Sequence, residues 1–128
     1  MLKIVRSIAI VDDDPAVLKA LARLLRTRSL TVTTHLSGLQ FLASLQSGFP
    51  DCLIADLQMP EMTGLELQKK LASRGLRIPT IIITAHDEAG MRDKCRSAGA
   101  IAYLVKPVQD TSLFAAIDAS GKSTKGWS

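Results

Sequence analysis

The sequence predicts an α/β fold in which helices cover both faces of a five-stranded parallel sheet. Five short apolar runs alternate with five segments of helical periodicity, and parallel strands need such crossover connections. Four of the five runs end directly at a polar residue, which is typical of strands buried on both faces. Because the chain has 128 residues, we expect one domain of the doubly wound class.

The first strand is expected over residues 7–11 and ends at Asp12. Asp14 and Pro15 then predict a helix, with Asp14 as its N-cap rather than a metal ligand. The inward residues of this helix, at helical spacing, are Leu18, Leu21, Ala22 and Leu25. A Thr-rich edge strand is expected over 31–36. Ser37 caps the second helix, whose apolar positions are Leu39, Phe41, Leu42 and Leu45 and which ends at Gly48.

The remaining elements follow the same alternation. Residues 52–55 form a short buried strand before Asp56, and a helix is expected over 64–73 with Gly75 as its terminator. A fourth strand at 79–83 precedes Thr84, and a weakly apolar helix follows over 88–97. The fifth strand, 101–105, ends at Lys106, and a last short helix covers 112–119. We expect one domain over 1–120 and a polar tail or linker over 121–128.

Composition excludes several classes of protein. With 47% apolar and 22% charged residues, the chain can close a hydrophobic core without disulfides, so Cys52 and Cys95 are expected to be buried thiols. The net charge of +4 is spread along the chain and only five residues are aromatic, which argues against direct nucleic-acid binding. No segment predicts a membrane span or a signal peptide, and we expect a cytoplasmic protein.

Polar residues gather at the carboxyl ends of the predicted strands. Asp12 and Asp13, Asp56, Thr84 and Lys106 follow strands one, three, four and five, and a parallel sheet brings them to one edge. Three clustered carboxylates repel one another unless a cation shares them, and an all-oxygen set favours Mg²⁺. A carboxylate beside a metal, a hydroxyl and an ammonium suits phosphoryl transfer. Asp56 is the expected nucleophile, because Asp12 and Asp13 are adjacent and placed to share the metal.

Four segments together resemble the response-regulator receiver domain of two-component signalling, across residues 5–119. They are IVDDD (10–14), ADLQMPEMTG (55–64), IIITA (81–85) and YLVKP (103–107). The resemblance implies a flavodoxin-like or CheY-like sheet of order 2-1-3-4-5. It also implies a phosphoacceptor switch rather than an enzyme, with Asp56 accepting a phosphoryl group from a histidine kinase or phosphotransfer protein in a Mg²⁺-dependent reaction.

The resemblance also assigns roles to individual residues. Asp12, Asp13, Asp56 and the Gln58 backbone carbonyl would hold the metal, and Thr84 and Lys106 would contact the phosphoryl oxygens. Tyr103 matches an aromatic switch that turns inward when Thr84 moves, altering the face formed by the fourth helix, fifth strand and fifth helix. The side chains of Gln58 and His86 are candidates for tuning the phosphoryl lifetime.

Partners and alternatives stay open at this point. Ala16, Leu18, Lys19 and Ala22 on the first helix are candidate contacts for the kinase, and the output is either a separate partner or a domain such as a helix-turn-helix. A phosphohydrolase is disfavoured because position 58 is Gln rather than an acid, and a flavodoxin-like cofactor binder because the acidic 12–15 loop repels phosphate. A pseudo-receiver that binds without phosphorylation is disfavoured because every expected site residue is present.

Overall fold

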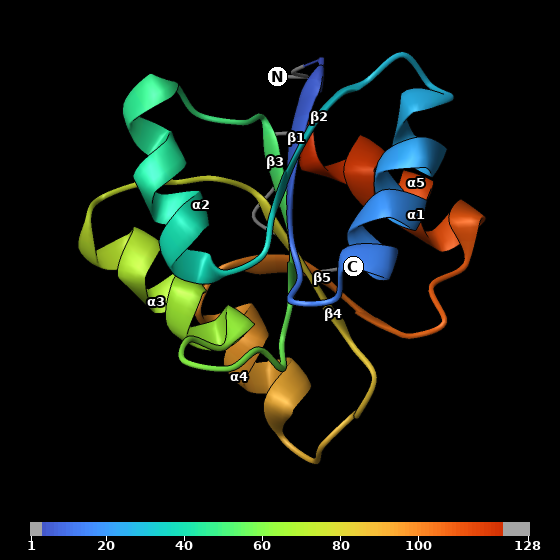
Figure 1. The fold of residues 1–128 in the computed structure, drawn as a ribbon. Coiled ribbons are helices and arrows are strands. Elements are labelled where there is room, and N and C mark those ends of the chain that lie inside the picture. The colour runs from blue at the N-terminus through green and yellow to red at the C-terminus, as the bar shows by residue number, and fades with distance from the viewer. Residues whose placement is uncertain (1–3, 122–128) are drawn as a thin grey trace.

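The computed structural model describes residues 4–121, which fold into one five-stranded parallel sheet between two layers of helices (Figure 1). The strand order is β2-β1-β3-β4-β5, as predicted. The strands are β1 (Ser7–Val11), β2 (Thr31–His35), β3 (Cys52–Asp56), β4 (Thr80–Thr84) and β5 (Ala100–Val105). The helices are α1 (Pro15–Arg26), α2 (Gly38–Ser44), α3 (Gly64–Ser73), α4 (Met91–Ser97) and α5 (Asp110–Ser120), with a 3₁₀ turn η1 (Leu45–Ser47) after α2.

Each face of the sheet has its own hydrophobic core. Helices α1 and α5 cover one face, where Ile10 and Ile54 pack against Leu25 and Leu113. Helices α2, α3 and α4 cover the other, around the fully buried Phe41 (Figure 1). β3 lies in the middle of the sheet, and all five of its residues are buried. This burial on both faces explains why the strand reads as a continuous apolar run up to Asp56.

Side-chain caps fix where several helices begin. Asp14 Oδ1 accepts a hydrogen bond from the Ala16 N–H at 2.9 Å, with Pro15 at the first helical position, as predicted. Thr63 and Glu66 form a reciprocal capping box at the start of α3. The loop that carries the residues after Asp56 is therefore tied to the start of a helix.

Some element boundaries differ from those expected. α4 begins at Met91 rather than Glu88, because Gly90 adopts a φ of +79° and no side chain caps the helix. α5 is longer than predicted, from Asp110 to Ser120, and Gly121 is its C-cap. β4 runs one residue later than expected, which makes Thr84 its last residue. Residues 122–128, most of the expected tail, lie outside the described residues, so the proposed boundary at 120 stays a prediction.

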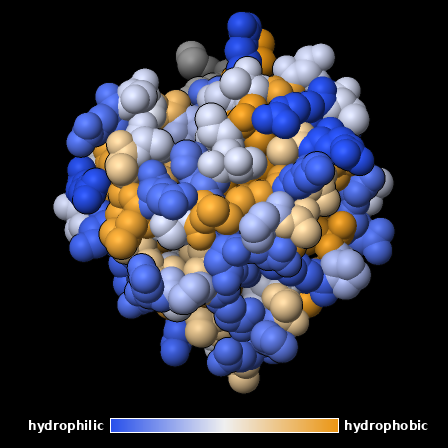
Figure 2. Space-filling model, in the orientation of Figure 1, coloured by the Kyte–Doolittle hydropathy of each residue, from blue (hydrophilic) through white to orange (hydrophobic). Residues whose placement is uncertain are grey.

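Burial corrects three further expectations. The sequence predicts Leu39 on the apolar side of its helix, but the residue is 55% exposed, because α2 has only seven residues and packs through Phe41 and Leu42. Leu18 and Ala22 are buried against the sheet, so they cannot contact a kinase, whereas Ala16 and Lys19 are exposed. Both cysteines are free and buried, as predicted. Figure 2 shows the outer surface in the same orientation, with apolar side chains along the middle of this face and hydrophilic ones around them.

Candidate functional site

Three aspartates meet at the carboxyl end of the sheet. Asp12 follows β1 and is fully buried, Asp56 ends β3 and is 5% exposed, and Asp13 is exposed. One carboxylate oxygen from each lies within 4.8 Å of the others. The sequence predicted that these aspartates would lie together, because they follow the ends of parallel strands. The parallel register of β1 and β3, which places Val11 opposite Ala55, brings them to the same edge of the sheet.

Lys106 is the counter-charge of the cluster. Its Nζ donates to Asp12 Oδ2 at 3.1 Å and lies 3.6 Å from Asp56 Oδ2. The ammonium is held there because the Lys106 N–H donates to Thr84 O at 2.7 Å, which continues the β4–β5 pairing beyond the last strand residue. The ammonium therefore faces both buried carboxylates from the end of β5.

Burial and the neighbouring charges shift the pKa values of Asp56 and Lys106. Burial, followed by the negative charge of Asp12, raises the pKa of Asp56, while Lys106 and the Gln58 N–H act in the opposite direction. Burial lowers the pKa of Lys106, but the hydrogen bond to Asp12 and the charges of Asp56 and Asp12 outweigh this, so that its pKa is raised overall. The cluster thus holds more negative charge than one ammonium neutralises.

A hard divalent cation fits this donor set. All three side-chain donors are carboxylate oxygens, no His or Cys lies among them, and their mutual distances allow one ion to contact them. Such an acidic cluster is typical of the magnesium site of receiver domains. Gln58 follows Asp56 by two residues, and its N–H donates to Asp56 Oδ1 at 3.3 Å.

The loop after Asp56 is fixed by a close backbone approach. A Cβ on Gly64 would lie 2.6 Å from the Asp56 carbonyl oxygen and 3.1 Å from the Leu57 Cα, so a larger residue cannot occupy this position without a backbone shift. The Gly64 N–H also donates to Leu57 O at 3.0 Å. Gly64 therefore lets the start of α3 pack directly on the strand end that presents Asp56.

Thr84 lies at the end of β4 but contacts the following loop rather than Asp56. Its fully buried hydroxyl is 2.9 Å from His86 O and 3.0 Å from Gln58 Oε1, and it accepts from the His86 N–H at 3.1 Å. Gln58 Nε2 also lies 3.4 Å from His86 O. Gln58, Thr84 and His86 thus form one polar network beside the cluster, with the His86 residue itself exposed.

Tyr103 lies inside the molecule, beside the loop between β4 and α4. The residue is only 3% exposed. Its hydroxyl donates to Asp87 Oδ1 at 3.1 Å, and the Arg92 guanidinium carbon lies 4.8 Å from the ring centroid. These contacts hold the ring inside in this structure, and the switching role of Tyr103 stays a prediction.

Asp87 is a residue that sequence reasoning missed. It stands in the loop between β4 and α4, three residues after Thr84, and bonds to Tyr103 from there. Burial, followed by the hydrogen bond and charge of Asp87, raises the pKa of Tyr103 to about 12. Nothing in the local sequence distinguishes Asp87 from other loop acids, because its partner is 16 residues away.

The fold and the site together define a phosphoacceptor switch rather than a classical enzyme: a buried acidic cluster with a lysine at the carboxyl end of a doubly wound sheet. The chain belongs to the response regulator receiver domain family, which it matches over residues 8–118. It is therefore a receiver domain of two-component signalling, in which the acidic cluster occupies the expected phosphorylation site. None of the helices in residues 4–121 is long and apolar enough to cross a membrane.

Individual relatives agree with this assignment. The chain is 44% identical over 110 residues to the response regulator protein TmoT of Ectopseudomonas mendocina, covering 86% of this chain and 50% of TmoT. It is 38% identical to the transcriptional regulatory protein FixJ of Azorhizobium caulinodans, covering 91% and 56%. The crystal structure of FixJ-N superimposes with a TM-score of 0.85 at 34% identity, covering 94% and 97%. The chain thus spans about half the length of these curated relatives.

Proposed function

We propose that Asp56 accepts the phosphoryl group, and that Asp12, Asp13, Asp56 and the Gln58 carbonyl hold the Mg²⁺ ion on which the reaction depends. The observation that carries this proposal is the position of Asp56 at the end of the central strand, nearly buried, with Asp12 and Asp13 carboxylates within 4.8 Å and Lys106 Nζ at 3.6 Å. A bound Mg²⁺ would supply charge neutralisation for the phosphoryl oxygens.

The chemical step needs little from the protein beyond position and charge. An Asp56 carboxylate oxygen attacks phosphorus, a new O–P bond forms, and the P–N bond of a phosphohistidine donor breaks. The imidazole of the donor keeps the electron pair of that bond and takes up a proton. Lys106 stabilises the added negative charge, because its ammonium already lies between Asp12 and Asp56.

Thr84 provides the route from the site to the surface. A phosphoryl group on Asp56 adds about −1.5 to −2 units of charge and three acceptor oxygens. We expect the Thr84 hydroxyl to turn toward those oxygens, because it now shares one proton between two neutral acceptors, His86 O and Gln58 Oε1. This movement would release the loop that carries Asp87, and Tyr103 would lose or rearrange its bond to that residue.

Gln58 and His86 are proposed to set the lifetime of the phosphoryl group. Gln58 is half-buried and His86 exposed, and the Gln58 amide lies within hydrogen-bonding distance of His86 O. The Gln58 N–H also donates to Asp56 Oδ1 at 3.3 Å, so these two side chains would affect how a hydrolytic water approaches Asp56.

The partner class follows from the family, and the finer assignments are proposals. A histidine kinase or a phosphotransfer protein would donate the phosphoryl group, with Ala16 and Lys19 on the exposed side of α1 as candidate contacts. Because the chain covers only about half of the length of its curated relatives, we propose an output domain, such as a helix-turn-helix, or a separate partner as the target of the switch. A cytoplasmic location fits these partners.

Intact mass tests the phosphoacceptor directly. The protein is incubated with Mg²⁺ and acetyl phosphate, alongside Asp56→Asn and the matched surface variant Asp118→Asn, whose carboxylate is exposed on α5. We expect wild type and Asp118→Asn to gain one phosphoryl group only when Mg²⁺ is present, and Asp56→Asn to gain none. A folded wild type that gains nothing from a donor active on a control receiver would contradict the proposal and favour a pseudo-receiver.

A further inference from the structure

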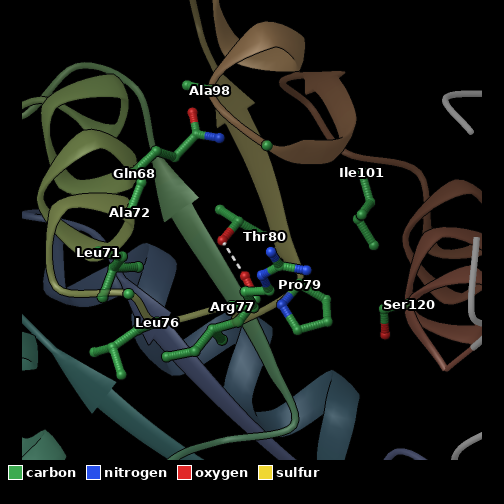
Figure 3. A pocket seen from close by; sticks show the side chains of 13 residues that line it. Gln68, Leu71, Ala72, Leu76, Arg77, Pro79, Thr80, Ala98, Ile101 and Ser120 are labelled. Carbon is green, nitrogen blue, oxygen red and sulfur yellow. Dashed lines mark hydrogen bonds between the residues drawn. The ribbon is translucent and has the colours of Figure 1, made fainter. Parts of the chain in front are cut away.

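A second site candidate lies at the opposite end of the sheet from Asp56. A cavity of about 610 Å³ opens at the amino-terminal ends of β4 and β5, between the last turns of α3, α4 and α5 (Figure 3). This volume falls within the range of roughly 300 to 1,000 Å³ that is usual for small-molecule sites. None of the residues proposed for phosphoryl transfer lines it.

Most of the cavity wall is apolar. Five aliphatic residues and a proline ring contribute from α3, from the connection to β4 and from β5. They are Leu71, Ala72, Leu76, Ile78, Pro79 and Ile101. Figure 3 labels all of them except Ile78 around the open space. A ligand that enters here must therefore bring an apolar body of a few carbon atoms.

Gln68 supplies an unused acceptor in this wall. The residue is 3% exposed, and its Nε2 donates to the carbonyl of Cys95 in α4 at 3.1 Å. Within residues 4–121, its Oε1 is the buried side-chain oxygen or nitrogen that has no hydrogen-bond partner. Figure 3 shows this amide beside Ala98, at the α4 side of the cavity. A buried acceptor without a donor is unfavourable, so a ligand N–H or O–H that reaches Gln68 Oε1 from the cavity would be stabilised there.

The other polar groups define what else a ligand needs. The Thr80 hydroxyl donates to Ile78 O at 2.8 Å and the Ser120 hydroxyl to Ile117 O at 2.6 Å, so both can only accept further bonds. Arg77 is the one charged residue among those lining the cavity, and it forms no hydrogen bond or ion pair within the described part of the chain. In Figure 3 its guanidinium extends toward the open space near Pro79. A guanidinium at this position favours a carboxylate.

We propose that this cavity binds small organic acids that combine a carboxylate, an N–H or O–H donor and a branched apolar body, as acylated amino acids do. The carboxylate pairs with Arg77, the donor bonds to Gln68 Oε1, and the apolar body contacts Leu71 and Ile101. The site is separate from the acidic cluster, where a carboxylate ligand would be repelled.

Amide chemical shifts of the ¹⁵N-labelled full chain test the proposal with N-acetyl-L-leucine as the probe. Because a ligand of this size binds with a dissociation constant of about 1 mM, we titrate to about 10 mM. Saturable shifts are expected at Leu71, Ala98, Gly99 and Ile101. Weaker binding is expected for 4-methylpentanoate, which lacks the N–H, and for N-acetyl-L-leucinamide, which lacks the charge.

Two exposed arginines provide a matched pair of variants. Arg77→Gln should weaken binding of the probe by about tenfold or more, the loss of one charged hydrogen bond. Arg74→Gln removes the same charge from the C-cap of α3 but from a residue outside the cavity lining, and should leave binding unchanged. Gln68→Met is expected to abolish the preference for N-acetyl-L-leucine over 4-methylpentanoate.

Three results would overturn the proposal. One is the absence of saturable shifts in a protein whose spectrum is folded and which still accepts a phosphoryl group. Another is a set of shifts confined to the neighbourhood of Lys106. The third is an equal loss of affinity in Arg77→Gln and Arg74→Gln, which would indicate general attraction of anions to a basic surface.

Discussion

Asp56 is held where its negative charge is unfavourable, although the proposed function needs that charge. The strand buries it, and two more carboxylates stand beside it with one lysine to offset them. Sequence alone predicted this gathering, because the carboxyl ends of parallel strands share one edge. The hydrogen bonds of Thr84 and the burial of Tyr103 could not be predicted, since both depend on where the β4–α4 loop places His86 and Asp87.

Removing the charge of Asp56 should stabilise the protein when no divalent cation is present. The raised pKa of Asp56 means that the folded state binds this proton more tightly than the unfolded state. The contribution of Asp56 to the free energy of unfolding is therefore fully present below the ordinary pKa of 3.8. It is lost as the pH rises through the raised pKa of the folded protein. We expect Asp56→Asn to increase the free energy of unfolding at pH 7 by about 1 kcal/mol, the scale of one close charge pair. Urea denaturation in EDTA measures this, and an unchanged or lower stability would contradict it.

Magnesium should offset the same repulsion. An ion that binds only the folded state adds about 2.7 kcal/mol of stability at a hundred times its dissociation constant. Thermal denaturation with increasing Mg²⁺ should therefore raise the melting temperature of the wild type. Asp13→Asn, at the exposed member of the cluster, should greatly reduce this rise, whereas Asp118→Asn should keep it. A full Mg²⁺ response in Asp13→Asn would exclude that residue from the metal site.

Tyr103 offers a spectroscopic check, because it is the only tyrosine in the sequence. Burial and the hydrogen bond to Asp87 raise its pKa to about 12, so the ultraviolet signal of tyrosinate should appear near that pH in the folded protein. The unfolded chain in urea should titrate near the ordinary value of 10.0. Folding stability from this group is consequently lost as the pH rises from 10.0 to about 12. Asp87→Asn should lower the folded pKa, and an unaffected titration would show that Asp87 does not control the ring.

At the scale of elements, the strand–helix alternation was predictable and the boundaries near the site were less so. β1 and α3 have the predicted bounds, and α1 begins at Pro15 as Asp14 and Pro15 predicted. The predicted start of α4, at residue 88, was wrong by three residues. The helix begins at Met91, because Gly90 stands before it in a left-handed conformation in place of a side-chain cap. Gln68 was also missed: it is a buried polar residue on α3 whose partner lies on α4, and no local pattern signals such a pair.

The contact between α3 and β3 can be tested with two glycines. Gly64→Ala places a Cβ 2.6 Å from the Asp56 carbonyl oxygen, and the overpacking should cost about 1 to 3 kcal/mol of stability and slow phosphorylation. Gly75→Ala meets no atom within 4 Å but has a φ of +71°, so it should cost about 1 kcal/mol and leave phosphorylation unchanged. Urea denaturation and intact-mass time courses measure both. Equal phosphorylation rates in the two variants would show that the Gly64 approach does not position Asp56.

At the scale of the whole molecule, the two proposed sites lie at opposite ends of the sheet. The acidic cluster lies at the carboxyl ends of β1 and β3, and the cavity beside Gln68 lies at the amino ends of β4 and β5. The family resemblance implied the strand order β2-β1-β3-β4-β5. It did not predict the cavity, because the cavity lies in the space between the last turns of three helices. Helix α4 stands between the two regions in the chain: the loop before it carries His86, which contacts Thr84, and Ala98, which directly follows it, lines the cavity.

The central claim is that phosphorylation of Asp56 moves the Thr84 hydroxyl, and that this movement changes the hydrogen bond between Asp87 and Tyr103. The most direct measurement is the ¹H–¹⁵N spectrum with Mg²⁺ and beryllofluoride, a phosphoryl mimic, for wild type, Asp56→Asn and Thr84→Ala. We predict shifts near Asp56, across residues 85–90 and at Tyr103 in the wild type, none in Asp56→Asn, and shifts confined to the Asp56 neighbourhood in Thr84→Ala. If Thr84→Ala carried the change to Tyr103 as fully as the wild type, the proposed route would be contradicted.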